Sequence, residues 1–187
     1  MRVLLQRVVR ASVLVDGAPV GTIGRGLLAF VGIDADDTPA DEDFIIRRVL
    51  ACRLFESPEG RPWAESVSSL RLPILIVSQF TLGASCRKAK PDFHRAMPAD
   101  KARLVYTRIV DAFRTAHPAG SDAVTTGQFQ AMMMVELIND GPVTVLIDSK
   151  DRESPGAVAG GGAASTSTGS MGSLAAVTPC ADPPVES

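Results

Sequence analysis

Cysteine is scarce in this chain of 187 residues, which contains three. Cys52, Cys86 and Cys180 lie far apart and form no CxxC pair. Zinc sites and disulfide frameworks both show characteristic cysteine spacings, so the sequence indicates neither. We infer a protein of a reducing compartment.

A large excess of charge of one sign is also absent, and the first segment has no long apolar run. The formal net charge is −2, which excludes a protein that coats nucleic acid nonspecifically and leaves room only for a local basic patch. The first segment, MRVLLQRVVRASVLVDG, has an arginine every few residues and no apolar run longer than four. It is neither a signal peptide nor a membrane span, so we expect a cytoplasmic protein with no membrane partner.

The usual motifs of catalytic bases and cofactors are missing as well. His94 and His117 are the two histidines, and neither belongs to a recognisable Ser/His/Asp arrangement. His117 precedes a proline at a predicted helix end, which favours a surface or capping role. The sequence has no HExxH, no P-loop and no dinucleotide fingerprint, so we expect no metal and no cofactor.

The composition changes abruptly at about Ser154. The stretch that follows is almost all Gly, Ala, Ser, Thr and Pro, without periodicity. It cannot bury enough apolar area to offset the entropy of ordering it. We therefore predict one globular domain over residues 1–150, long enough for a real core, and a disordered tail over residues 151–187.

Strands dominate the predicted domain. Short runs rich in Val, Leu and Ile, separated by Gly, Asp or Pro, predict an opening β-meander with strands over 3–8, 12–17, 19–24 and 26–33. The run LPILIVSQFTL, residues 72–82, is continuous and typical of a central strand buried on both faces. Further strands over 124–140 and 142–148 close the core. Between them, Asn139 to Pro142 predict a bend or reversal of the chain.

Two helices are predicted. Thr38 as the N-cap, Pro39 at the first helical position and acids in the first turn begin a helix over 39–53. A second helix runs from Pro98 to His117, where the following proline ends it. The order of elements predicts an α+β fold in which both helices pack on a largely antiparallel sheet or open barrel.

Two polar segments could carry chemistry. SQFTL, residues 78–82, ends the central strand, but strands often end in polar residues, and Thr81 would need a base that is not visible locally. ASCRKAKPDFHRA follows, with one acid, Asp92, among four cations. Those cations could grip phosphate or form an ordinary solvated surface, and Phe93 could stack on a base or simply pack. The cations are Arg87, Lys88, Lys90 and Arg95.

Five motifs taken together are specific. They are QRV at 6–8, SQFTL at 78–82, KPDF at 90–93, TGQFQAMM at 126–133 and NDGPVT at 139–144. In this order and spacing they closely resemble the D-aminoacyl-tRNA deacylase family, over about residues 1–149. The pairing of SQFTL with NDGPVT is the strongest part of the resemblance, and neither motif alone would suffice.

The resemblance implies a homodimer with active sites at the subunit interface. It would hydrolyse the ester between a D-amino acid, or glycine, and the terminal adenosine of tRNA. Gly141 and Pro142 would form a cis peptide that each subunit inserts into its partner's pocket, and Arg7 would brace that loop. Phe129 and Met133 would line the adenosine pocket. The catalytic segment would be Ser78, Gln79, Phe80 and Thr81, and the four cations named above would contact the tRNA.

This placement would explain a selection for one chirality. If backbone groups of the catalytic segment and of the Gly-Pro loop hold the α-amino and carbonyl groups, a D side chain points to solvent. An L side chain would strike main-chain atoms. Two chemistries are open: Thr81 as a nucleophile, or hydrolysis assisted by the 2′-hydroxyl of the tRNA with backbone donors. We favour the second, because no base accompanies Thr81.

Two departures and two alternatives accompany the resemblance. Met132 stands where a polar or acidic residue is more common in the family, and the 59–72 segment lacks a common asparagine-containing pattern. A noncatalytic RNA-binding module would have degraded site residues, but these are present. An editing domain for misacylated L-amino acids would lack the Gly-Pro pair, so its presence favours the D-specific function.

Overall fold

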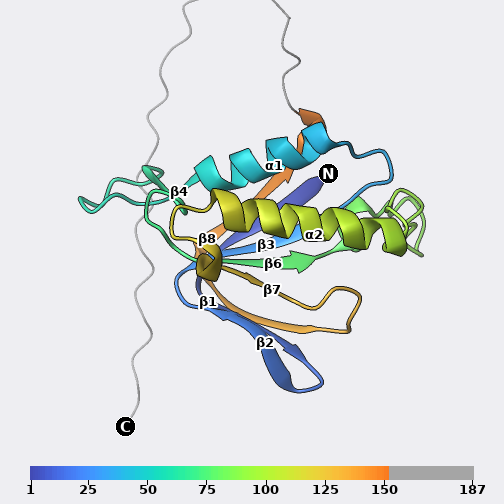
Figure 1. Cartoon of the computed structure of the whole chain (residues 1–187), viewed down its shortest axis with the longest axis horizontal. Helices are drawn as coiled ribbons and strands as arrows, with labels where there is room; N and C mark the ends of the chain where they lie inside the picture. Colours follow the sequence, from blue (N-terminus) through green and yellow to red (C-terminus); the bar gives the residue numbers. More distant parts are fainter. Residues whose placement is uncertain (152–187) are drawn as a thin grey trace, which may run out of the picture. The chain divides into compact units, whose positions relative to one another are not determined.

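The computed structural model describes residues 1–151 (Figure 1). The predicted disordered tail, apart from Asp151, and Cys180 lie outside these residues. Within the described part of the chain, no helix is long and apolar enough to cross a membrane.

A mixed six-stranded sheet forms the body of residues 1–151. Its strands are β1 (Arg2–Val15), β2 (Ala18–Ile23), β3 (Gly26–Gly32), β6 (Ile74–Ser78), β7 (Val124–Thr126) and β8 (Met134–Asp148). The order is β2-β1-β3-β6-β7, with β8 on the other edge of β1. β1 pairs antiparallel with β2, β3 and β8, whereas β6 runs parallel to β3 and β7. The α+β sheet or open barrel is confirmed, with two parallel pairs inside it.

β1 is one long strand where the sequence predicts two. One edge pairs first with β3 and then with β2, while β8 pairs along the other edge from Arg2 to Leu14. The apolar pattern of residues 3–8 ends before the polar residues Arg10 and Ser12. The strand nevertheless continues there, because both residues pair with β8. The prediction of a break between 8 and 12 is therefore wrong.

The sheet curls until β2 and β7 approach each other. A Cβ built on Gly21 of β2 would lie 2.7 Å from the Thr126 carbonyl oxygen of β7. A real side chain does not fit at that distance, so glycine permits the close approach that nearly closes the barrel.

The helices α1 (Pro39–Ala51) and α2 (Ala99–Ala116) confirm both predicted helices to within one or two residues at their ends. At the start of α1 the Asp41 carboxylate accepts hydrogen bonds from the Thr38 N–H at 2.9 Å and from Thr38 Oγ1 at 2.6 Å. Figure 1 shows α1 and α2 side by side over the same face of the sheet. A short hairpin, β4 (Arg53–Phe55) and β5 (Glu65–Ser66), is not predicted from sequence.

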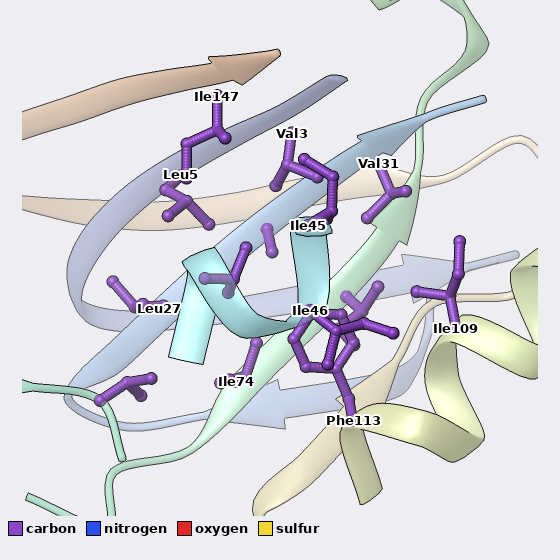
Figure 2. Close-up of a cluster of buried hydrophobic side chains, with 14 of the residues drawn as sticks. Val3, Leu5, Leu27, Val31, Ile45, Ile46, Ile74, Ile109, Phe113 and Ile147 are labelled. Carbon is purple, nitrogen blue, oxygen red and sulfur yellow. The ribbon is translucent and has the colours of Figure 1, made fainter. Parts of the chain in front are cut away.

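The main core lies between the two helices and the sheet (Figure 2). Ile109 and Phe113 of α2 lie one helical turn apart and are fully buried, as is Ile45 of α1. On β6, Ile74 and Ile76 belong to this core, while alternate residues of the strand belong to a second cluster on the opposite face. The prediction of a central strand buried on both faces is confirmed for β6.

His117 caps the end of α2 from a buried position. Its side chain is 3% exposed, Nδ1 accepts the Ala119 N–H at 3.2 Å, and Nε2 lies 3.0 Å from the Leu72 carbonyl oxygen. Because Nδ1 accepts, the proton of the neutral ring resides on Nε2 and is donated to Leu72. His117 is confirmed as the C-cap residue of α2 through its backbone N–H, which bonds the Phe113 carbonyl at 2.9 Å, and the surface position is wrong.

Acidification is expected to weaken the fold through His117. Burial lowers the pKa of His117 below its ordinary value of 6.5, so the unfolded chain binds a proton at a higher pH than the folded chain does. Its share of the free energy of unfolding is therefore present above about pH 6.5 and falls as the pH drops further. Urea unfolding of wild type and His117→Gln at pH 8 and pH 5.5 checks this. An equally steep loss of stability in the variant would contradict it.

Candidate active site

The predicted catalytic segment, residues 78–81, begins where β6 leaves the sheet. The β3–β6 ladder ends at the pair Val31 and Ser78, and one further bond joins the Gln79 N–H to the Val31 carbonyl at 2.8 Å. The chain then forms a 3₁₀ helix, Phe80–Gly83. The predicted strand over 72–82 is wrong beyond Ser78, because the backbone turns away from β3 there and leaves Phe80 57% exposed.

Thr81 lies exposed on this 3₁₀ helix. Gln79 Nε2 donates to Thr81 Oγ1 at 2.6 Å. An amide cannot take a proton from a hydroxyl at neutral pH, and among residues 1–151 no histidine or carboxylate is hydrogen-bonded to Thr81. The geometry supplies no activated nucleophile.

A pocket of about 590 Å³ lies beside the segment. Its size falls in the range of small-molecule sites, roughly 300–1,000 Å³. Its walls are the ends of β3 and β6, the first turn of α2 and the loop 127–133. The exposed Met132, one of the two departures noted above, lies at its rim and is 91% exposed. Five of the predicted site residues meet here: Ser78, Gln79, Phe80, Phe129 and Met133.

The loop 127–133 replaces a predicted strand over 124–140. Only residues 124–126 and 134 onward join the sheet, because the segment between them folds against α2. The Phe129 ring lies 5.4 Å from the Tyr106 ring, centroid to centroid, and Tyr106 donates its hydroxyl to the Ile76 carbonyl at 2.9 Å. Burial raises the pKa of Tyr106, which keeps that donor neutral. Sequence reasoning missed Tyr106; its one available signal was a polar tip on the apolar face of a predicted helix.

The Gly-Pro segment is a bulge inside β8 and not a reversal. Asn139 pairs with Val8 of β1 and Thr144 pairs with Gln6, so residues 140–143 all stand opposite Arg7. The Gly141–Pro142 peptide bond is cis, and Gly141 has φ +120°. The predicted bend is present, but the chain continues in the same strand because both flanks pair with β1.

Arg7 holds this bulge by its charge and by hydrogen bonds. Arg7 Nε lies 3.1 Å from Asp140 Oδ2, and Nη1 donates to the Leu54 carbonyl of β4 at 2.7 Å. The guanidinium therefore joins the bulge to the β4 strand. The contacts of Arg7 with Asp140 and Leu54 were not predicted from the sequence, because only the tertiary fold brings β4 next to Arg7.

The structure does not bring the bulge to the pocket of its own chain. On β3, Val31 pairs with Ser78 of the pocket, and Leu27 pairs with Arg7, which stands opposite the bulge. These two positions of β3 are four residues apart, which is about 13 Å along the strand at roughly 3.3 Å per residue. Gly141 and Pro142 are both exposed. One chain thus carries the pocket and the Gly-Pro bulge as two separate parts.

The basic segment forms a loop next to the pocket. Ser85 and Asp92 exchange backbone hydrogen bonds of 2.8 and 2.9 Å, and the loop lines a second hollow of about 610 Å³. Phe93 packs edge-on against Phe80 of the catalytic segment, with centroids 5.1 Å apart. His94 donates its N–H to Asp92 and places its ring nitrogen 2.6 Å from the carboxylate, which lowers the pKa of Asp92.

The four predicted cations of this loop line the second hollow, but one differs from the rest. Arg87, Lys88 and Lys90 are exposed, whereas Arg95 Nη2 lies 3.1 Å from Asp34 Oδ2. Asp34 is 3% exposed and also lies 3.5 Å from Arg2 Nη1. Arg95 therefore anchors the loop to the core, and the other three cations face solvent.

No group of three or more metal-ligating side chains occurs within residues 1–151. Cys52 and Cys86 are both free thiols.

Comparison with known proteins gives a consistent set of similarities. The family model described as D-Tyr-tRNA(Tyr) deacylase matches residues 4–148. The D-aminoacyl-tRNA deacylase 1 of Danio rerio is 42% identical over 149 residues, which are 80% of this chain and 71% of that protein. The D-aminoacyl-tRNA deacylase of Thermotoga petrophila is 44% identical over 150 residues, 80% of this chain and 97% of that protein.

Two solved structures are also similar. One, described as c-Myc DNA Unwinding Element Binding Protein, is 38% identical with a TM-score of 0.76, and the match covers 83% of this chain and 100% of the other. A probable eukaryotic D-amino acid tRNA deacylase is 23% identical with a TM-score of 0.66, covering 79% and 98%, and shows the fold alone.

Proposed function

The chain belongs to the D-Tyr-tRNA(Tyr) deacylase family, whose model matches residues 4–148, and from that premise we propose that it hydrolyses the ester bond of D-aminoacyl-tRNAs. The observation that carries this proposal is the meeting of Ser78, Gln79 and Phe80 with Phe129 and Met133 around one pocket. An apolar wall with a polar strand end at its mouth suits a nucleoside whose ester projects toward the backbone of the segment.

The 3₁₀ helix Phe80–Gly83 supplies donors for the reacting carbonyl. The first N–H groups of a helical turn have no carbonyl partner inside the turn, so those of Phe80 and Thr81 are the candidates. Pre-oriented backbone donors stabilise the oxyanion of an ester hydrolysis. In the proposed reaction the vicinal 2′-hydroxyl of the tRNA assists attack by water, since the geometry gives Thr81 no base.

A second copy of the chain would complete the site. The Gly-Pro bulge lies too far from the pocket of its own chain, and it is exposed. Apolar side chains are also exposed on the strands beside it, which is typical of a surface that another subunit covers. They are Val9 of β1 and Met134, Ile138 and Leu146 of β8. We infer a homodimer in which each bulge enters the other subunit's pocket.

Chirality would then be selected by main-chain atoms. With the α-amino and carbonyl groups held by the 78–81 segment and the bulge, the D side chain points to solvent and an L side chain meets backbone. Glycine has no side chain to reject, so the same filter would admit glycyl-tRNA. The free thiols Cys52 and Cys86 fit the cytoplasm, where aminoacyl-tRNA is used.

The basic loop would hold the tRNA next to its 3′ end. The double variant Lys88→Ala/Lys90→Ala is expected to raise KM and to flatten its dependence on salt, with a log–log slope smaller by about 1.4–1.8. KM measured between 50 and 200 mM salt checks this, with Arg47→Ala on α1 as the control for an exposed cation away from the loop. An unchanged slope in the double variant would contradict the assignment.

Release of free D-tyrosine from D-Tyr-tRNA by the purified protein tests the proposal against a noncatalytic RNA-binding module. The deacylase releases the amino acid with many turnovers. A module that binds tRNA would leave the ester intact or protect it from spontaneous hydrolysis, and that result would refute the proposed function.

A further inference from the structure

One side chain of α2 holds two successive residues of the pocket wall. The guanidinium carbon of Arg103 lies 5.0 Å from the centroid of the Phe129 ring, and Arg103 Nη2 donates to Gln130 Oε1 at 2.6 Å. Arg103 itself does not line the pocket, whereas Phe129 and Gln130 do. The side-chain contacts of Arg103 with the pocket wall run through these two residues.

The wall needs such a hold because its backbone is strained at Gln130. Gln130 has φ +64°, in the left-handed region that residues with a Cβ adopt rarely. A conformation of this kind persists where surrounding contacts determine it. The Ala131 N–H bonds the Gln128 carbonyl at 3.2 Å within the loop, and Arg103 adds a contact from a rigid helix outside it.

The same helix ties the wall to the catalytic segment. Tyr106, three residues after Arg103 and on the same side of α2, contacts the Phe129 ring and donates to the Ile76 carbonyl of β6. β6 ends in Ser78, where the segment begins. Arg103 and Tyr106 together fix Phe129 relative to β6, the strand that precedes the 3₁₀ helix with the proposed backbone donors.

We propose that Arg103 is a positioning residue that orders the 129–130 wall for the terminal nucleoside. It sets the affinity for that nucleoside and leaves the ester-cleaving step largely unchanged. The inference rests on the proposed function, because it takes the pocket to be the nucleoside site of an aminoacyl-tRNA.

Steady-state kinetics distinguish a residue that positions the substrate from a residue that acts on the reaction itself. Arg103→Ala is expected to raise KM for D-Tyr-tRNA about tenfold with kcat within about twofold, from loss of the ring contact and the charged hydrogen bond. Arg103→Lys keeps the charge but cannot both stack and reach Gln130, so its KM should fall between wild type and Arg103→Ala. Arg114→Ala, which removes an exposed cation from the same helix, should leave KM unchanged.

A binding measurement with a short probe that lacks the tRNA body excludes the effect of removing a positive charge on binding to the tRNA phosphates. The probe is adenosine carrying D-tyrosine through a stable 3′-amide, measured by calorimetry. Its Kd should rise about tenfold for Arg103→Ala and stay unchanged for Arg114→Ala. Gln130→Ala, which removes the hydrogen bond from the other side, should weaken binding in the same direction and serves if Arg103→Ala does not fold.

The inference would be overturned if the fully folded Arg103→Ala or Gln130→Ala protein bound the probe as wild type does. A fall in kcat with KM unchanged would also overturn it, since that pattern belongs to a group acting on the reaction itself. Failure of the proposed function is visible separately: the wild-type protein would then release no D-tyrosine from D-Tyr-tRNA, whether or not it binds the probe.

Discussion

Gly141→Ala is expected to lower kcat/KM for D-Tyr-tRNA by about 100-fold, because the added Cβ displaces the bulge and a misplacement of about 1 Å can cost that much. A Cβ at this position would lie 2.7 Å from Val143 Cγ2, 2.9 Å from the Val143 nitrogen and 3.0 Å from Arg7 Nη2. Two of these neighbours are firmly placed: the backbone nitrogen, and a guanidinium held by Asp140 and Leu54. The φ of +120° adds strain for any residue with a Cβ.

The same displacement should reduce the discrimination between D and L esters. In the proposed dimer the bulge supplies the main-chain atoms that an L side chain strikes, so a shifted bulge would admit L-Tyr-tRNA more readily. Parallel measurement of kcat/KM for the two esters checks both effects. Gly17→Ala is the matched control, because Gly17 also has a positive φ, +81°, but has open space around it. Full activity and full D selectivity in Gly141→Ala would contradict the role given to the bulge.

A D-Tyr-tRNA that ends in 2′-deoxyadenosine is expected to be cleaved at least about 100-fold more slowly than the natural substrate. In the proposed chemistry the 2′-hydroxyl takes part in the proton transfers, since within residues 1–151 no histidine or carboxylate is hydrogen-bonded to Thr81. The loss should appear in kcat, because the apolar pocket and the basic loop still bind the modified end. Single-turnover rates at saturating enzyme measure it. Cleavage of the deoxy substrate at the full rate would exclude assistance by the 2′-hydroxyl.

The companion variant Thr81→Ala separates this chemistry from an acyl-enzyme. It removes the hydroxyl that accepts from Gln79 and leaves the backbone N–H groups of the 3₁₀ helix in place. Its single-turnover rate should stay within about tenfold of wild type, since a lost uncharged hydrogen bond is worth about 0.5–1.5 kcal/mol. A complete loss of hydrolysis with tRNA binding intact would make Thr81 the nucleophile.

The fold could be predicted wherever one local pattern decided the structure. Pro39 with acids in the first turn located α1, and the continuous apolar run located β6 between two layers. Prediction failed where pairing with a strand distant in sequence determined the structure. β1 is continuous because β8 pairs along its whole length, and β8 passes through Asn139 to Pro142 because both its halves pair with β1. Pairing across such a distance in sequence leaves no local mark.

The candidate site likewise has a part that could be predicted from the sequence and a part that could not. The motifs led to Ser78, Gln79, Phe80, Phe129 and Met133, which the fold brings around one pocket. The contacts that hold them in place come from residues of ordinary appearance in the sequence, such as Arg103 and Tyr106 on α2 and Asp140 opposite Arg7. An arginine on a helix surface has no local sign that it will meet a loop 27 residues later.

The most direct test compares D-Tyr-tRNA and L-Tyr-tRNA in parallel with the wild-type protein at one enzyme concentration. A main-chain filter that rejects L side chains predicts rapid release of D-tyrosine, while L-Tyr-tRNA decays at its spontaneous rate. Comparable hydrolysis of both esters, or hydrolysis of neither, would contradict a chirality-selective deacylase.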